Sequence, residues 1–108
     1  MSTDDRAPGT QLEFAWDPDK AASNLAKHGV PFAEATVMLT DPLAITVFDA
    51  AHSGVEERWF TLGTSAGGKL LAVAHTYTAS GPASARVRII SAREATRAER
   101  RQYEEGPR

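Results

Sequence analysis

Four short runs of alternating apolar and polar residues fill the chain from Leu43 onward, and they constrain its fold more than any other feature. Each run has six to nine residues and is rich in apolar side chains, and Gly-containing turn segments separate neighbouring runs. A period of two is typical of half-buried β-strands, and the simplest connection of such runs is an antiparallel meander. The four predicted strands are LAITVF (43–48), ERWFTLG (57–63), KLLAVAHTY (69–77) and RVRIISA (86–92).

Helix boundary signals lie on both sides of these strands. Asp17 precedes Pro18, as an N-cap precedes a proline at the first helical position, and Gly29 stands where a left-handed C-cap is expected. A second short helix is predicted over residues 31–39, and a third begins at the capping box of residues 96–99. The predicted fold class is α+β, with two N-terminal helices, a four-stranded mainly antiparallel sheet and a C-terminal helix.

The first helix is expected to be amphipathic, with a narrow face of mostly small apolar side chains. Its apolar face is narrow, and its polar residues lie on a different face at helical spacing. The apolar face consists of Ala21, Ala22, Leu25 and Ala26, and the polar face of Lys20, Asn24 and Lys27.

Length and composition favour one domain in the cytoplasm. A chain of 108 residues is long enough for a single modest core, expected over residues 12–106 and beginning with a strand-like segment, LEFAW (12–16). The polar residues 1–11 are expected to be a disordered lead-in, because they contain neither a signal peptide nor an apolar anchor. The sequence has no cysteine and no apolar stretch of the roughly 20 residues that span a bilayer, so neither a disulfide nor a membrane contact is expected.

Six arginines between residues 86 and 101 form a strongly cationic segment in a slightly acidic chain. Residues 1–57 carry ten acidic residues against three basic ones, whereas residues 86–101 carry the six arginines against two glutamates, so the formal net charge of −2 is a cancellation. Guanidinium groups bind phosphate oxygens two at a time, and a cationic face attracts nucleic acid or an acidic protein. A solvated surface of salt bridges is the alternative interpretation.

Separated blocks of the sequence, in the same order, resemble the BrnT family of type II toxin proteins. The blocks cover most of the 108 residues, which makes the resemblance more specific than one short motif. It implies a RelE-like fold, metal-independent endoribonuclease activity that arrests translation, and neutralisation by a BrnA-like antitoxin that also supplies any contact with DNA. The blocks are FAWDPDKAASNLAKHGVPFAEA, DPLAIT, HSGVEERWFTLG, KLLAVAHT and RVRIISAREATRAERRQYEE.

Arginines are the candidate phosphate ligands, because metal-independent RNA cleavage requires cations for the charge that develops on the phosphorane, together with a base and an acid. Arg88 is favoured, with Arg86 at the rim, because the strand pleat puts both on one face. Arg93 falls on the other face unless a bulge intervenes, and as the strand-end residue it remains a candidate substrate contact; the alternative is a cap on the adjacent helix or an ion pair with Glu94. Arg58 is a second candidate phosphate ligand, and Arg97 is a candidate substrate contact.

The candidate proton carriers are His28, His52, His75, Glu57 and Lys27, of which His75, Glu57 and Lys27 are favoured. His75 ends an apolar strand next to the arginine strand, and histidine titrates near neutrality, but a satisfied core histidine is the alternative. Lys27 and His28 end the first helix, where they either favour the helix dipole or contact RNA and assist proton transfer. His52 lies in a loop and is expected to be exposed, without a role.

Tyr77 is a candidate RNA contact, with packing as the alternative. No histidines and carboxylates have the spacing of metal ligands, such as i and i+4 on one helix. Neither a metal nor another cofactor is therefore expected.

Three functions from different classes agree with these patterns. The first is the endoribonuclease toxin implied by the family resemblance, with RNA as its substrate. The second is a nonenzymatic protein-interaction domain that binds an acidic partner through its arginine face. The third, a DNA-binding regulator acting alone, is disfavoured because no helix combines basic residues with the turn signature of a recognition helix.

Overall fold

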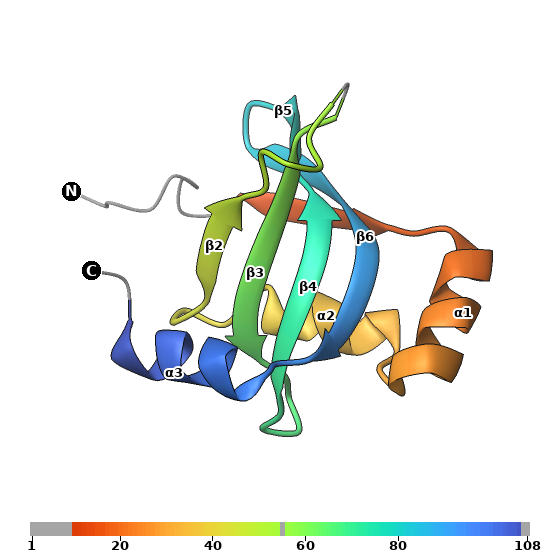
Figure 1. The fold of residues 1–108 in the computed structure, drawn as a ribbon. Helices are drawn as coiled ribbons and strands as arrows, with labels where there is room; N and C mark the ends of the chain where they lie inside the picture. Colours follow the sequence, from red (N-terminus) through yellow and green to blue (C-terminus); the bar gives the residue numbers. More distant parts are fainter. Residues whose placement is uncertain (1–9, 55, 107–108) are drawn as a thin grey trace.

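The fold is built on one mixed β-sheet with helices around it (Figure 1). The computed structural model of the chain describes residues 10–54 and 56–106, and this part contains six strands and three helices. They are β1 (Gln11–Ala15), α1 (Pro18–His28), α2 (Phe32–Met38), β2 (Ile45–Phe48), β3 (Arg58–Thr64), β4 (Leu70–Thr76), β5 (Thr78–Gly81), β6 (Ser84–Glu94) and α3 (Arg97–Glu105).

The sheet contains six strands, so the prediction of a four-stranded meander was wrong. Its strand order is β1-β6-β4-β3-β2, with β5 also paired to β6. β1, which precedes both N-terminal helices, runs parallel to β6, and residues 11–15 pair with residues 84–88. Pairing between segments so far apart leaves no local signal, and β5 (TASG) lacks the apolar alternation that marks the other strands.

β6 joins the two parts of the sheet. Its first half pairs with β1 and β5, and its second half pairs with β4. The register with β4 shifts by one residue, because Ala74 lies opposite Ser91 while His75 lies opposite Ile89. Ile90 is therefore an extra residue, a β-bulge, and the side chains that follow it change face.

The core lies between the sheet and α2, which Figure 1 shows behind the sheet, while α1 lies beside the edge of β6. The bulge in β6 keeps this side apolar, because Val87 and Ile89 are buried before it and Ala92 is buried after it. The core cluster consists of Val30, Phe32, Ala35, Met38, Leu71, Val73, Val87, Ile89 and Ala92.

The predicted ends of α1 are confirmed. The Asp17 carboxylate accepts a hydrogen bond from the backbone N–H of Asp19 (2.9 Å), and Pro18 is the first helical residue. Gly29 ends the helix with a left-handed φ of 72°, a conformation that glycine adopts without steric cost.

α1 docks mainly through Asn24, and of the predicted apolar face only Ala21 packs against the core. Asn24 is the only buried residue of this helix, whereas Leu25 is 48% exposed. The Asn24 amide donates to the carbonyls of Val30 (3.1 Å) and Ala92 (2.8 Å), and its oxygen accepts from the Ala92 N–H (3.1 Å). Because β1 ends opposite Arg88, the edge of β6 beyond that point has no strand partner, and Asn24 supplies the missing hydrogen bonds.

α2 begins at Phe32, one residue later than expected, with Pro31 as its N-cap. Its C-terminal end lies so close to β3 that only glycine fits at position 63. A Cβ atom on Gly63 would lie 2.9 Å from the backbone oxygen of Met38. This close approach fixes the position of α2 across the sheet.

α3 begins at the predicted capping box, which is confirmed. The Thr96 hydroxyl accepts from the Glu99 N–H (3.2 Å), and the Glu99 carboxylate accepts from the Thr96 N–H (2.9 Å). No residue of α3 is buried. The helix is instead tied to the sheet by Tyr103, whose hydroxyl donates to Asp41 (2.6 Å) and accepts from the Thr64 hydroxyl (3.1 Å).

The disordered lead-in expected over residues 1–11 lies mostly outside the described residues, which begin at Thr10. Gln11 is already part of β1. None of the helices in the described segments has both the length and the hydrophobicity needed to cross a bilayer.

Replacing Asn24 by alanine is expected to destabilise the fold. The variant leaves the N–H and C=O groups of Ala92 without their partners, at a cost of about 1–3 kcal/mol for each buried polar group left unpaired. Urea denaturation should show a lower free energy of unfolding for Asn24→Ala and little change for the exposed neighbour Ser23→Ala. Equal stability of the two variants would contradict the role given to Asn24.

Candidate functional site

The sheet has one face covered by helices and one largely open face. α2 lies behind the sheet in Figure 1 and α1 lies beside it at the β6 edge, whereas on the front only α3, among the described segments, crosses one end. Side chains that lie opposite each other on neighbouring strands share a face. The register and the strand alternation put Arg58, Phe60, Arg88 and Arg93 on the front, and we call this surface the open face.

Two arginines lie on either side of Thr76 at the upper end of the open face. Arg58 on β3 lies opposite Thr76 on β4, and the Thr76 hydroxyl accepts a hydrogen bond from the backbone N–H of Arg88 on β6 (3.1 Å). One strand separates the two arginines, so their backbones are about 10 Å apart. The side chains of Arg58 and Arg88 therefore lie at the same end of the open face.

An aromatic ring lies next to this pair. Phe60 follows Arg58 by two residues and lies opposite Ala74, which in turn lies opposite Ser91 on β6. The neighbouring side chains of Ala74 and Ser91 are small, and the Phe60 ring stays partly exposed. The guanidinium carbon of Arg93 is 5.8 Å from the centre of the ring, a cation–π contact.

The bulge at Ile90 puts Arg93 on the same face as Arg88, whereas the regular pleat predicted opposite faces. Arg93 lies opposite Ala72, and its guanidinium donates two hydrogen bonds to the Glu99 carboxylate (2.8 and 3.0 Å). The pleat argument was wrong because one inserted residue reverses the alternation beyond it. The ion-pair partner of Arg93 is Glu99 and not Glu94, the glutamate considered from the sequence, whose backbone carbonyl alone accepts from Arg93 (3.3 Å).

Carboxylates accompany three of the four arginines on the strands of the open face. The fourth, Arg58, is half-buried, and its guanidinium contacts no carboxylate within residues 10–54 and 56–106. Arg58 is therefore the cation of this face that is most ready for an anionic ligand. The pairs are Arg88 with Glu56, Arg93 with Glu99, and Arg86 with Glu13, the last at 3.8 Å.

A surface pocket continues the open face where β1, β5 and β6 meet. Its lining includes Arg86, Arg88, Glu56, Thr76 and Ser80. The pocket meets the upper end of the open face at Arg88 and Thr76. Arg86 lies at the outer side of this pocket, with its side chain 66% exposed.

His75 lies on the helix-covered face, away from the arginines. It is 4% exposed, its Nδ1 donates to the Thr76 carbonyl oxygen (2.9 Å), and its Nε2 accepts from the Thr61 hydroxyl (2.8 Å). Burial lowers the pKa of His75, which favours the neutral ring. This is the core environment that the sequence left open as the alternative, and Tyr77 likewise packs against the core.

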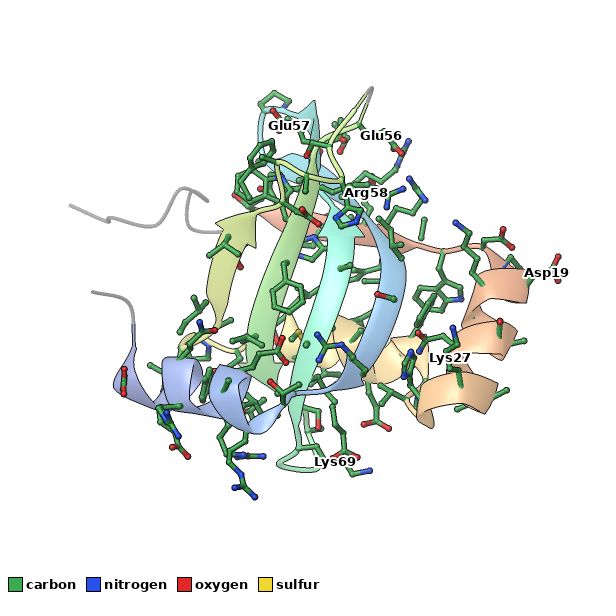
Figure 2. All side chains as sticks on the ribbon, viewed as in Figure 1. Asp19, Lys27, Glu56, Glu57, Arg58 and Lys69 are labelled. Carbon is green, nitrogen blue, oxygen red and sulfur yellow. The ribbon has the colours of Figure 1, made fainter. Side chains whose placement is uncertain are left out.

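The remaining candidates are exposed and lie at different places. Glu57 is exposed directly before Arg58, and Figure 2 shows both at the upper end of the sheet. Lys27 and His28 are exposed at the end of α1, and Figure 2 shows Lys27 well away from Arg58. Arg97 is exposed in the first turn of α3.

Two residues of this site were missed from the sequence. Glu56 contacts Arg88, but it lies in a loop whose conformation no local pattern predicts, so the sequence pointed to the neighbouring Glu57. Phe60 shares the open face with Arg58, and their spacing of two on a predicted strand is the signal that would have found it.

The open face offers cations and an aromatic ring as ligands. Arg58 and Arg88 present guanidinium groups that fit phosphate oxygens, and Phe60 presents a ring on which a planar base can stack. Within the described residues, no three histidine or carboxylate side chains gather where they could hold a metal ion.

Two comparisons with known proteins agree with each other. Residues 16–99 match the family described as "Ribonuclease toxin, BrnT, of type II toxin-antitoxin system". The fold is similar to the 1.1 Å crystal structure of the Brucella abortus ribonuclease toxin BrnT, with a TM-score of 0.57 and 26% sequence identity, over 82% of this chain and 100% of that chain. Among curated proteins, none matches the sequence.

The pairing of Arg93 with Glu99 predicts an acid-sensitive contact between α3 and the open face. The hydrogen bonds from Arg93 lower the pKa of Glu99 from its ordinary 4.5 to about 2. A carboxyl group whose pKa is lower in the folded chain than in the unfolded chain stabilises the fold above its ordinary pKa. This stabilisation should be complete above about pH 5 and should be lost as the pH falls from there toward 2.

Urea denaturation over this pH range tests the contact. The free energy of unfolding should fall less steeply with acidification in Glu99→Gln than in the unchanged chain, because the variant has no carboxyl group to protonate. Glu104→Gln, on the exposed surface of the same helix, is the matched control and should keep the original slope. The same slope in all three proteins would contradict the prediction.

Proposed function

This chain belongs to the BrnT family of ribonuclease toxins of type II toxin–antitoxin systems, and from that premise we propose that it binds RNA on its open face and cleaves it without a metal ion. Cleavage of cellular RNA by this activity would arrest translation. The observation that carries the proposal is the placement of Arg58 and Arg88 on either side of Thr76, next to the partly exposed ring of Phe60. Cations for a phosphate and a ring for a base thus adjoin each other.

The proposed reaction uses a nucleophile that RNA itself supplies. The 2′-oxygen forms a bond to the adjacent phosphorus, the bond from phosphorus to the 5′-oxygen breaks, and a 2′,3′-cyclic phosphate results. Negative charge develops on the phosphoryl oxygens in the transition state, and preorganised donors at those oxygens lower the barrier. Arg88 and Arg58 take this role in our proposal, and Arg86 binds a neighbouring phosphate at the pocket rim.

The remaining contacts in the proposal orient the RNA. A base stacks on Phe60, an interaction worth about 1–3 kcal/mol per base in proteins that bind single strands. Glu56 positions the guanidinium of Arg88, and Arg93 contacts the Phe60 ring. Lys27, His28 and Arg97 lie outside this area and contact only an RNA long enough to extend over α1 or α3.

His75 is assigned a structural role in this proposal. Both of its ring nitrogens already have partners inside the protein, and it lies on the face opposite the arginines. Its loss should therefore lower stability before it changes chemistry. Tyr77 is also assigned a structural role, because it packs against the core on the covered side of the sheet.

The partner proposed to control the activity is an antitoxin similar to BrnA. An acidic segment of such a protein would compete with RNA for the open face. It would also meet Arg100 and Arg101, exposed arginines of α3 that contact no carboxylate in the described part of the chain. Contact with DNA would arise only through the antitoxin in the complex.

One other function has a specific observation in its favour. An open cationic face with a partly exposed aromatic ring also suits a nonenzymatic domain that binds an acidic protein segment. Such a domain would need Arg58 and Arg88 for affinity alone. An RNA cleavage assay separates the two functions, because only the ribonuclease breaks the RNA chain.

The purified protein is expected to cleave single-stranded RNA in the presence of EDTA. The products should carry a 2′,3′-cyclic phosphate, or the 3′-phosphate formed from it, because the 2′-oxygen is the proposed nucleophile. Mass spectrometry of the fragments identifies these ends. Strict dependence on magnesium, or fragments with 5′-phosphates, would reject the mechanism.

Loss of one guanidinium should affect turnover more than binding. Arg88→Ala is expected to lower single-turnover cleavage about 10²-fold or more, comparable with the loss of one preorganised oxyanion donor, while RNA affinity falls much less. The control Arg101→Ala, on α3, should leave turnover unchanged, and with an RNA long enough to extend over α3 it should reduce the salt slope of binding by about 0.7, the value for one phosphate contact on a single strand. Equal effects of the two substitutions on turnover would remove Arg88 from the reaction.

A further inference from the structure

The loop between β2 and β3 carries a histidine, His52, paired with a carboxylate, Asp49. The Asp49 N–H donates to the Arg58 carbonyl oxygen (2.8 Å), which extends the β2–β3 ladder by one residue beyond the pairing of Phe48 with Trp59. Because side chains alternate along a strand, Asp49 lies on the same face as Arg58. The loop therefore begins on the open face.

His52 is oriented by Asp49. Its Nδ1 is 2.9 Å from the Asp49 carboxylate, and its backbone N–H donates to the other carboxylate oxygen (3.3 Å). An ionised carboxylate only accepts hydrogen bonds, so this contact assigns the ring proton to Nδ1 and leaves Nε2 as an acceptor. The side chain of His52 is 68% exposed, and Nε2 has no partner in the described part of the chain.

A second set of hydrogen bonds fixes this pair relative to Arg58. The Ser53 hydroxyl donates to the Asp49 carbonyl oxygen (2.7 Å) and accepts from the backbone N–H of Arg58 (3.0 Å). Through Ser53, the backbone of Asp49 is therefore tied to the backbone of Arg58, the proposed phosphate ligand on β3. His75, in contrast, has both nitrogens engaged in the core.

We propose that His52, held by Asp49, is the general base of the RNA cleavage reaction, an inference that rests on the proposed ribonuclease function. Neutral His52 takes the proton of the 2′-hydroxyl on Nε2 as the 2′-oxygen bonds to phosphorus. The bond to the 5′-oxygen breaks, that oxygen takes a proton from solvent, and the imidazolium later returns its proton to solvent. Asp49 fixes the tautomer and stabilises the imidazolium, as a carboxylate does in a catalytic triad.

Single-turnover cleavage of a model RNA at saturating protein tests the proposal. His52→Ala is expected to lower the rate about 10² to 10⁴-fold with little change in RNA affinity, as for the loss of a general base. Added imidazole should restore part of the rate, because it replaces the missing ring without repairing any structural defect. Asp49→Asn should lower the rate less than His52→Ala and should not respond to imidazole.

Ser53→Ala is the matched control, because it removes the hydrogen bonds that fix the loop and keeps both His52 and Asp49. It should reduce the rate far less than His52→Ala, with no response to imidazole. Full activity of His52→Ala, or a loss that imidazole does not restore, would overturn the role of His52 while the proposed function stands. Absence of RNA cleavage by the unchanged protein would instead reject the ribonuclease function itself.

Discussion

A single extra residue in β6, Ile90, is the constraint on which both faces of the sheet depend. It lets Val87 and Ile89 enter the core before the bulge and Ala92 enter it afterwards. With a regular pleat, Ser91 would take the place of Ala92 opposite Val73 and bring a hydroxyl group into the core, and Arg93 would turn away from the open face. The same inserted residue therefore completes the core and gathers the arginines on the opposite face.

The edge of β6 explains how α1 is attached without a large apolar interface. β1 covers this edge only as far as Arg88, and the Asn24 side chain takes over at Ala92. A short helix with an exposed leucine can dock in this way because an amide side chain has the same donor and acceptor as the backbone of a strand. The position of α1 is thus set by hydrogen-bond geometry more than by its apolar surface.

Local features were predictable from the sequence, and features that join distant segments were not. The caps at Asp17 and Gly29 and the capping box at Thr96 depend on neighbouring residues, and each occurs as predicted. The parallel pairing of β1 and the bulge at Ile90 depend on strands far apart in sequence. The candidate site follows the same division, because Arg58 and Arg88 stand out as charges on strands, whereas Glu56 reaches Arg88 only through the fold of a loop.

The glutamates that accompany Arg86, Arg88 and Arg93 act as counter-ions built into the chain. An incoming anion must displace them, and exchanging one exposed ion pair for another gains little free energy. A small anion that meets one arginine therefore competes poorly. A polymer that presents several negative charges in succession replaces the glutamates together, since each exchange raises the local concentration of the next charge. The face thus discriminates by the number of connected charges on its ligand.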